Sequence, residues 1–248
     1  MTAETEREVE ALKRAGKVAA LVLQKMLSQV RPGITTLELD EIGEKEMTRY
    51  GARSAPRSQY RFPGATCISV NEEVAHGIPG QRKLQAGDKV NIDVSLELDG
   101  YFVDTGATVI IPPVSEEGDR LCRAAQSALK KALQAARAGQ PLYEVGRAVE
   151  REARRFGFTV VKNLCGHGVG RALHEEPRHI LNFYHPEQSE ILKKGMVLAI
   201  EPFISTGEQF VEEAEDGWTL YAPHGSWVAQ FEHTIIVTEQ EPIVITAL

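Results

Sequence analysis

The stretch VNIDVSLELDGYFVDTGATV, residues 90–109, decides the fold class of this chain. In its first half apolar residues alternate with polar ones, which is the period-two pattern of a half-buried β-strand. Asp99-Gly100 then supplies a two-residue turn of the kind that β-hairpins favour. The stretch therefore predicts an antiparallel hairpin of two long strands.

The register of this hairpin directs two carboxylates to one face. With the turn in this position, Asp93 lies opposite Gly106, and Asp104 lies opposite Ser95. The two aspartates are then diagonal neighbours, about 7–8 Å apart at the backbone. Two carboxylates aimed at one spot repel each other unless they share a proton or a cation. The pair indicates either a cation site, with Gly106 allowing close approach of a ligand, or a solvated polar sheet face.

Helical segments on either side of the hairpin form an internal repeat. Residues 14–51 match residues 120–157 without gaps at an offset of 106, with twelve identities in 38 positions. Each copy predicts a long helix, a break, and a second helix with a glycine stop. The glycines at these breaks and stops are Gly33, Gly51, Gly139 and Gly157. The alternatives are chance similarity of two amphipathic helices or a duplication, and the shared glycines favour duplication.

Duplication predicts two related α+β halves, about residues 5–111 and 112–248, that share one core. Helices and strands come in blocks, and hairpin signals outnumber crossovers, so we expect a mainly antiparallel sheet covered by helices. Further strands are predicted near residues 66–71, 158–163, 196–204 and 230–237.

Composition excludes several functional classes. The 248 residues are 42% hydrophobic and 25% charged, which is typical of a globular protein with a sizeable core. A formal charge of −7 argues against nucleic-acid binding, although a local basic patch stays open. No signal peptide and no run of eighteen apolar residues are present, so we expect no membrane association. Three scattered cysteines fit a reducing, cytoplasmic environment.

Two further carboxylates interrupt apolar strands. Glu201 stands within MVLAIEPFI, and Glu232 stands within VAQFEHTIIV. Burying such a carboxylate is costly unless it is paired or bound to a metal, and the alternative is an edge position that faces water. The segment CGHGVGRALHEEP adds two imidazoles, His167 and His174, on either side of a glycine run.

Familiar motifs do not explain this histidine segment. His174-Glu175 begins like a zincin helix, but Arg178 occupies the position of the second histidine, and Pro177 breaks a helix there. The glycines at 166, 168 and 170 are too closely spaced for a dinucleotide-binding loop. Small residues of this kind instead let the backbone pack against a ligand site.

Together these residues form an oxygen-rich set with one nitrogen: Asp93, Asp104, His167, Glu201 and Glu232. That mixture suits a pair of divalent ions such as Mn, Co, Fe or Zn, and it is too poor in thiols for structural zinc. Two ions a few ångströms apart hold and acidify a water molecule, so the set predicts a hydrolase.

The chain resembles the type I methionine aminopeptidases, in the bacterial-style single-domain form. The matching segments, in the order of the family, are CISVNEEVAHGIP, GDKVNIDVSLELDGYFVDTGATV, CGHGVGRALHEEP, AIEPFI, DGWT and AQFEHTIIV. The resemblance implies the duplicated pita-bread fold, in which a curved antiparallel sheet carries two pseudo-symmetric helix pairs on its outer face. It covers nearly the whole chain, and it implies one catalytic domain over residues 1–248.

The resemblance also implies a role for each candidate residue. Asp93 would bind one metal ion, His167 and Glu201 would bind the other, and Asp104 and Glu232 would bridge both. Glu201 would also pass a proton to the leaving amine. The non-ligand imidazoles would be His76, which holds the peptide backbone, and His174, which stabilises the oxyanion. The methionine pocket would be lined by Phe62, Cys67, Leu173 and Trp218. Residues 54–66 match the family less closely.

The implied activity is removal of the initiator methionine from nascent proteins whose second residue is small. The expected partners are such polypeptide N-termini, with the ribosome as an additional candidate, and we expect a monomer. Two rival readings stay open: a catalytically inactive binding protein of the same fold, and an enzyme that cleaves imidodipeptides or X-Pro bonds. The five intact ligands argue against the first. The absence of a large additional domain, and of the insertion seen in type II enzymes, argues against the second reading and the type II form.

Overall fold

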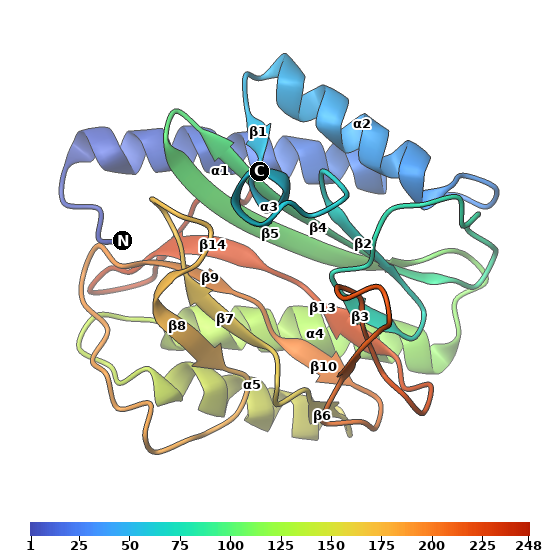
Figure 1. Cartoon of the computed structure of the whole chain (residues 1–248). Helices are drawn as coiled ribbons and strands as arrows, with labels where there is room; N and C mark the ends of the chain where they lie inside the picture. The colour runs from blue at the N-terminus through green and yellow to red at the C-terminus, as the bar shows by residue number, and fades with distance from the viewer.

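The computed structural model describes the whole chain, residues 1–248, as an α+β fold (Figure 1). Its helices are α1 (Glu6–Leu27), α2 (Thr36–Arg49), α3 (Ala55–Tyr60), α4 (Glu116–Ala135) and α5 (Tyr143–Arg155). The strands of the first half are β1 (Arg53–Ser54), β2 (Cys67–Val70), β3 (Glu73–Ala75), β4 (Lys89–Leu98) and β5 (Tyr101–Ile110). Those of the second half are β6 (Thr159–Val160), β7 (Cys165–Gly168), β8 (Glu175–Leu181), β9 (Val197–Ile200), β10 (Phe203–Ser205), β11 (Glu212–Glu213), β12 (Leu220–Tyr221), β13 (Val228–Gln230), β14 (His233–Ile236) and β15 (Ile243–Val244).

The predicted hairpin is present as β4 and β5. Asp99 and Gly100 have φ of 54° and 80°, and two positive φ angles define the turn type that matches the twist of a β-hairpin. The register pairs Asp93 with Gly106 and Ser95 with Asp104, as predicted. Both aspartates therefore lie on one face of the hairpin.

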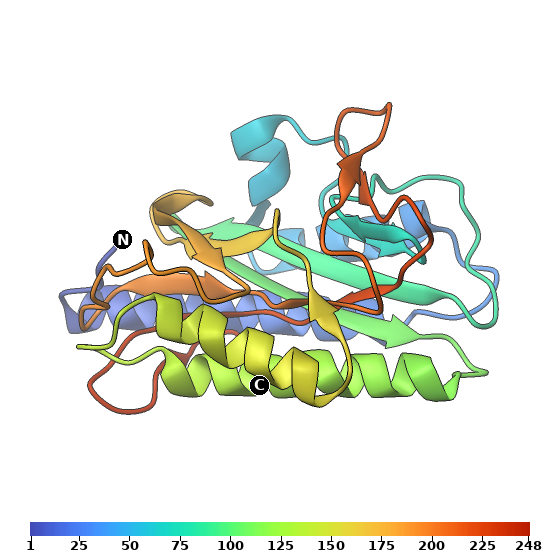
Figure 2. The same cartoon turned by 90° about the horizontal axis from the view of Figure 1, so that it is seen from below.

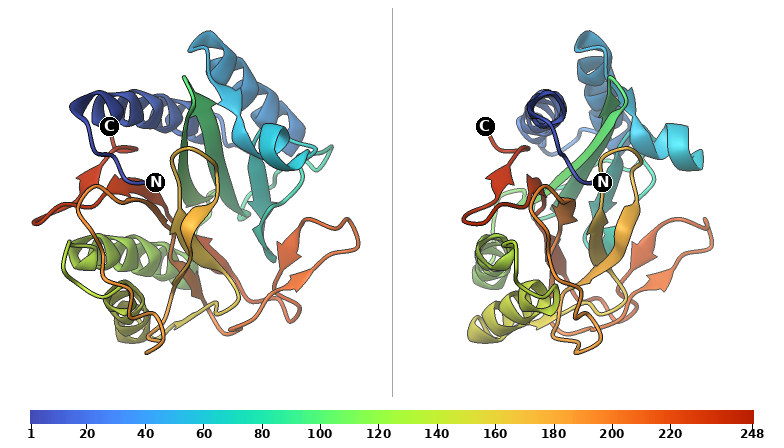
Figure 3. Two further views of the ribbon diagram at one scale, coloured as in Figure 1. Left: turned by 60° about the vertical axis from the view of Figure 1, so that its left-hand side comes forward. Right: turned by 90° about the vertical axis from the view of Figure 1, so that its left-hand side faces the viewer.

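The repeated segments form the helix pairs α1–α2 and α4–α5. The four glycines predicted to break or end these helices all have positive φ, between 73° and 89°. Thr5 and Thr35 begin α1 and α2 with capping boxes completed by Glu8 and Glu38. In Figure 2, α1, α4 and α5 form a layer beneath the strands, while Figure 3 shows α3 on the opposite side of the sheet from α1 and α4. No helix has the length and apolar character needed to span a membrane.

All strand pairs are antiparallel, as predicted. The first sheet has the order β1-β4-β2, with β5 on β4, and the largest has the order β15-β14-β9-β7-β8. A smaller sheet, β13-β10-β6, and a second small sheet, β11-β12-β3, complete the arrangement. The predicted strand at 158–163 is reduced to Thr159–Val160.

Two segments that were predicted as continuous strands are each interrupted at a glutamate, so their predicted continuity was wrong. The segment 196–204 divides into β9 and β10 around Glu201, and 230–237 divides into β13 and β14 around Glu232. Each break transfers the chain from the largest sheet to the β13-β10-β6 sheet or back. Pro202 has no N–H to continue a ladder at the first break. Glu201 and Glu232 thus lie at junctions between two sheets, outside the regular strands in which side chains alternate between faces.

The buried apolar side chains form three clusters, and the largest contains residues of both halves. A cluster of 31 buried residues lies under α1 and the hairpin and extends into the second half through residues such as Val169 and Val197. A separate cluster of 21 lies between α4, α5 and the second-half strands. A buried polar seam runs between β5 and β13, where Thr108 Oγ1 donates to the carbonyl of Gln230 at 2.8 Å. These hydrogen bonds join β5 of the first half to β13 of the second half.

Candidate metal centre and substrate pocket

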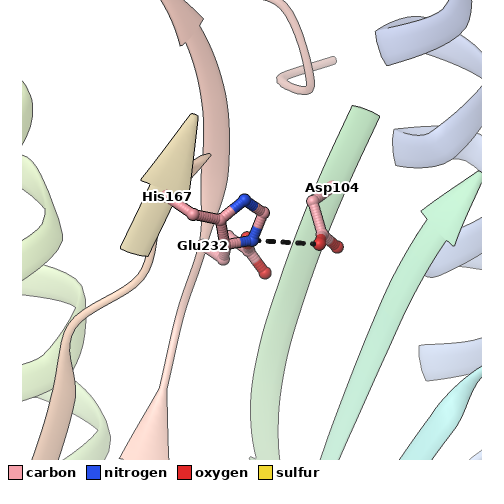
Figure 4. Close-up of side chains that lie close together, drawn as sticks. All are labelled: Asp104, His167 and Glu232. Atoms are coloured by element: carbon pink, nitrogen blue, oxygen red, sulfur yellow. Dashed lines mark ion pairs between the residues drawn. The ribbon is translucent and has the colours of Figure 1, made fainter. Parts of the chain in front are cut away.

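Carboxylates and one imidazole from four segments meet beside the hairpin. The ligand atoms of Asp104, His167 and Glu232 all lie within 4.8 Å of one another, and all three residues are buried. Figure 4 shows the three side chains directed at a common point. His167 Nε2 is 3.7 Å from Asp104 Oδ2 and 3.6 Å from Glu201 Oε1. Asp93, opposite Gly106, lies next to Asp104 and completes the predicted set of five.

Burial perturbs every titratable group in this cluster. It raises the pKa of Asp104 to about 6. Burial, reinforced by the charge of Asp104, raises the pKa values of Asp93, Glu201 and Glu232 well above their usual range. The same burial lowers the pKa of His167 to about 3, so its imidazole is neutral. Such a cluster of acids stays ionised only when a cation compensates the charge.

Unpartnered oxygen atoms test whether these residues fit a metal ion. Asp93 Oδ1 and Glu232 Oε1 are buried and have no hydrogen-bond partner, although buried polar atoms are normally paired. His167 Nδ1 lies 2.9 Å from the carbonyl oxygen of Gly168, the bond that metal-binding histidines usually make with their second nitrogen. Oxygen donors with one imidazole suit divalent transition metals. The residues therefore fit a divalent metal centre.

Hydrogen bonds from residues that the sequence did not single out hold the carboxylates. Ser95 Oγ donates to Asp104 Oδ1 at 2.8 Å, and the backbone N–H of Asp104 donates to Thr234 Oγ1 at 2.8 Å. Gln230 Nε2 donates to Glu232 Oε2 at 3.0 Å and is itself fixed by Asn91. The period-two pattern could have identified Asn91 and Ser95, since both share a strand face with Asp93.

Gly106 has a different role from the one predicted. A Cβ at this position would lie 2.5 Å from Oε1 and 2.8 Å from Nε2 of Gln230. The glycine therefore makes room for the Gln230 amide, which contacts Glu232, and not directly for a ligand.

A cavity of about 300 Å³ opens beside the cluster. All four residues predicted for the methionine pocket line it: Phe62, Cys67, Leu173 and Trp218. Phe62 and Trp218 pack edge to face, with ring centroids 5.3 Å apart. His76 and His174 also line this cavity, together with Asp93, Asp104, His167 and Glu201. The structure thus brings the predicted pocket and nearly all of the predicted ligands to one cavity.

The profile of metallopeptidase family M24 matches residues 10–239. The chain belongs to this family. It is 49% identical to methionine aminopeptidase 2 of Bacillus subtilis strain 168, and the alignment covers 100% of both chains. The crystal structure of methionine aminopeptidase from Rickettsia prowazekii superimposes with a TM-score of 0.95 at 35% identity, covering 100% of each chain. Prolidase from Pyrococcus furiosus matches at 23% identity with a TM-score of 0.79, covering 98% of this chain and 65% of that one, which shows the shared fold alone.

In this M24 metallopeptidase, residues 54–66 also contribute to the cavity. α3 places Pro56 and Tyr60 in the cavity wall. The hydroxyl group of Tyr60 lies 2.7 Å from His174 Nδ1. Sequence reasoning missed Tyr60, because no periodic pattern connects this short helix with a histidine more than a hundred residues away.

Proposed function

We propose that this M24 metallopeptidase is a methionine aminopeptidase that removes the initiator methionine from nascent proteins whose second residue is small. The observation that carries the proposal is the buried Asp104–His167–Glu232 group beside a cavity of about 300 Å³ with aromatic and aliphatic walls. The Bacillus subtilis and Rickettsia prowazekii relatives, which match over the full chain, are named as methionine aminopeptidases.

Two divalent ions per chain, Mn, Co, Fe or Zn, are the cofactors that we propose for this centre. Asp93 would hold one ion, His167 and Glu201 the other, and Asp104 and Glu232 would contact both. The unpartnered oxygens of Asp93 and Glu232 support this assignment, since each has a free acceptor in a buried position. When bound, such ions supply Lewis acidity and an activated water for peptide hydrolysis.

The protein's own groups would orient the substrate and move the proton. Glu201, whose Oε1 lies beside His167, would carry a proton to the leaving amine, as general acid–base catalysis requires a carboxyl group within hydrogen-bond reach. His174 would donate a hydrogen bond to the developing oxyanion, a contribution worth about 3–4 kcal/mol for one good donor. His76, which lines the same cavity, would hold the peptide backbone.

The apolar part of the cavity would select the methionine side chain. Phe62 and Trp218 form an aromatic wall, and Cys67 and Leu173, both buried, complete the slot. A flexible, unbranched thioether adapts well to such a slot. A mismatched side chain loses about 1–3 kcal/mol in a pocket of this kind.

We propose one catalytic domain over residues 1–248, built of halves at about 5–111 and 112–248, that acts as a monomer in the cytoplasm. Its macromolecular partners would be emerging polypeptide N-termini, with ribosome docking as an additional candidate and no direct contact with nucleic acid. Sedimentation of the purified protein, alone and with ribosomes, tests the oligomeric state and the docking.

A peptide panel with metal reconstitution tests the activity. Protein purified without added metal is analysed for bound ions, then assayed with Mn, Fe, Co and Zn in turn. We expect cleavage of Met-Ala and Met-Gly peptides, and poor cleavage of Met-Lys, Met-Leu, Leu-Ala and Gly-Pro. Equal kcat/KM for Met-Ala and Leu-Ala would contradict methionine specificity, and preference for Gly-Pro would point to an X-Pro enzyme.

A further inference from the structure

Two imidazoles stand side by side at the centre of the site. The rings of His167 and His174 have centroids 4.1 Å apart and planes inclined at 47°. Their Nδ1 atoms have different partners, a backbone carbonyl for His167 and a phenol for His174. In a neutral imidazole one nitrogen carries hydrogen and the other accepts, and the partner of one nitrogen decides the state of the other.

The partner of His167 fixes its tautomer. The carbonyl oxygen of Gly168 can only accept, so the Nδ1 atom at 2.9 Å must carry the hydrogen. The lone pair then lies on Nε2, which faces Asp104 at 3.7 Å and Glu201 at 3.6 Å. This is the tautomer that binds a metal ion.

The partner of His174 favours the opposite tautomer. The hydroxyl group of Tyr60 lies 2.7 Å from Nδ1, a distance typical of a good O–H donor, and His174 is its one protein hydrogen-bond partner. A phenol is a better donor than acceptor, while an unprotonated imidazole nitrogen is a strong acceptor. The hydroxyl therefore donates to Nδ1, which leaves the hydrogen of His174 on Nε2.

Local structure holds Tyr60 in this position. It is the last residue of α3, whose N-terminus is capped by Ser54, since the backbone N–H of Arg57 donates to Ser54 Oγ at 3.3 Å. The Ser54 hydroxyl group also donates to the carbonyl oxygen of Ala65 at 2.7 Å, so it connects the start of α3 with the segment that follows this helix. The rings of Tyr60 and His174 also pack at a centroid distance of 5.4 Å.

We infer that Tyr60 is a positioning residue that keeps His174 in the Nε2–H tautomer, so that this imidazole donates to substrate while its neighbour His167 keeps a free Nε2 for metal. The inference rests on the proposed function and deepens it, because it assigns the oxyanion donor its hydrogen. It also explains why the two adjacent histidines keep different tautomers. Nδ1 of His167 faces a hydrogen-bond acceptor, whereas Nδ1 of His174 faces a donor.

The tautomers can be read directly by NMR. The full chain is labelled with ¹⁵N-histidine, and the long-range ¹H–¹⁵N correlations distinguish the nitrogen that carries hydrogen from the one that accepts. The chain has seven histidines, so His174→Gln assigns the signals of this residue. We expect an accepting Nδ1 in His174 and a hydrogen-bearing Nδ1 in His167. In Tyr60→Phe, His174 should become a mixture of tautomers while His167 is unchanged.

Kinetics on the metal-loaded protein give a second readout. Because one hydrogen bond contributes about 0.5–1.5 kcal/mol, Tyr60→Phe should lower kcat about 2- to 10-fold with KM nearly constant. The loss should vanish in a His174→Ala background, since Tyr60 acts only through that ring. Tyr50→Phe, at a similarly exposed tyrosine that does not line the cavity, is the matched control and should change neither readout.

The outcomes separate this inference from the proposed function. A hydrogen-bearing Nδ1 in His174 of the parent chain, or an unchanged spectrum in Tyr60→Phe, overturns the role of Tyr60 whatever peptide is cleaved. An equal loss of kcat with and without His174 overturns it as well. If the tautomers are as assigned and no methionine peptide is cleaved, the proposed function fails and the tautomer assignment stands.

Discussion

Replacement of Glu232 by glutamine should make the metal-free protein more stable while it removes metal binding. The Glu232 side chain is buried, its Oε1 has no hydrogen-bond partner, and its pKa is raised well above the usual range by burial and by neighbouring Asp104. A glutamine keeps the shape, accepts from Gln230 through its oxygen, and presents its NH₂ group to the neighbouring carboxylates. Without metal, folding must either bury the charge of Glu232 beside other carboxylates or add a proton to it, and a neutral glutamine avoids this cost.

The magnitude follows from the cost of an unsatisfied buried group, which is about 1–3 kcal/mol. Taking about 2 kcal/mol, the melting temperature of a chain of this length should rise by about 4–8 °C in the presence of a chelator. A metal ion at a hundred times its Kd stabilises the folded parent chain by about 2.7 kcal/mol, and Glu232→Gln should lose most of this gain. Hydrolysis of Met-Ala should fall to background.

Thermal unfolding with chelator and with added Mn or Co, together with metal analysis, measures all three effects. Glu213→Gln makes the same chemical change at an exposed position on β11 and should behave as the parent. If metal-free Glu232→Gln melts below the parent and still gains the full stabilisation from metal, Glu232 is not a ligand, and the electrostatic reasoning about the cluster is wrong.

Three other substitutions test separate parts of the structure. His174→Ala should lower kcat by about two to three orders of magnitude with metal content unchanged, because it removes a hydrogen-bond donor and not a metal ligand. Loss of metal would show that His174 is one of the metal ligands. Gly106→Ala should displace the Gln230 amide from Glu232 and weaken metal affinity about 10- to 100-fold, as measured by titration against a chelator. An unchanged affinity would show that Gln230 does not position Glu232. Burial lowers the pKa of Lys89 from 10.5 to about 8, so the folded chain releases this proton at a lower pH than the unfolded chain does. The free energy of unfolding should then rise by about 3 kcal/mol from pH 8 to pH 10.5. Urea unfolding of Lys89→Met should lack this rise, and the same rise in both chains would contradict it.

Local sequence determined the hairpin and the helix pairs. The alternation after Val90, together with Asp99-Gly100, fixed a register in which Asp93 faces Gly106, because side-chain direction in a strand alternates residue by residue. The repeated glycines adopted the positive φ angles that residues with a Cβ rarely accept, so they located the helix ends. Information of this kind lies within a few residues along the chain, and pattern reasoning can reach it.

The resemblance to methionine aminopeptidases supplied the assignments that pattern reasoning left open, such as the four residues that line the methionine pocket. Residue patterns by themselves could place Glu201 and Glu232 in apolar strands, but they could not show whether these carboxylates face water or meet the aspartates. They also did not predict the break of both strands at the glutamates or the amide of Gln230 that fills the space over Gly106.

Only the tertiary structure decided which groups touch across the two halves. Asp104 is held by Thr234, 130 residues away, and His174 is held by Tyr60, 114 residues away. Such contacts depend on how two sheets join and on where a short helix such as α3 lies, and no periodicity records either. The physical reason is that turn geometry and side-chain alternation act over neighbouring residues, whereas hydrogen-bond partners and buried charges are set by packing between segments that the chain brings together only when it folds.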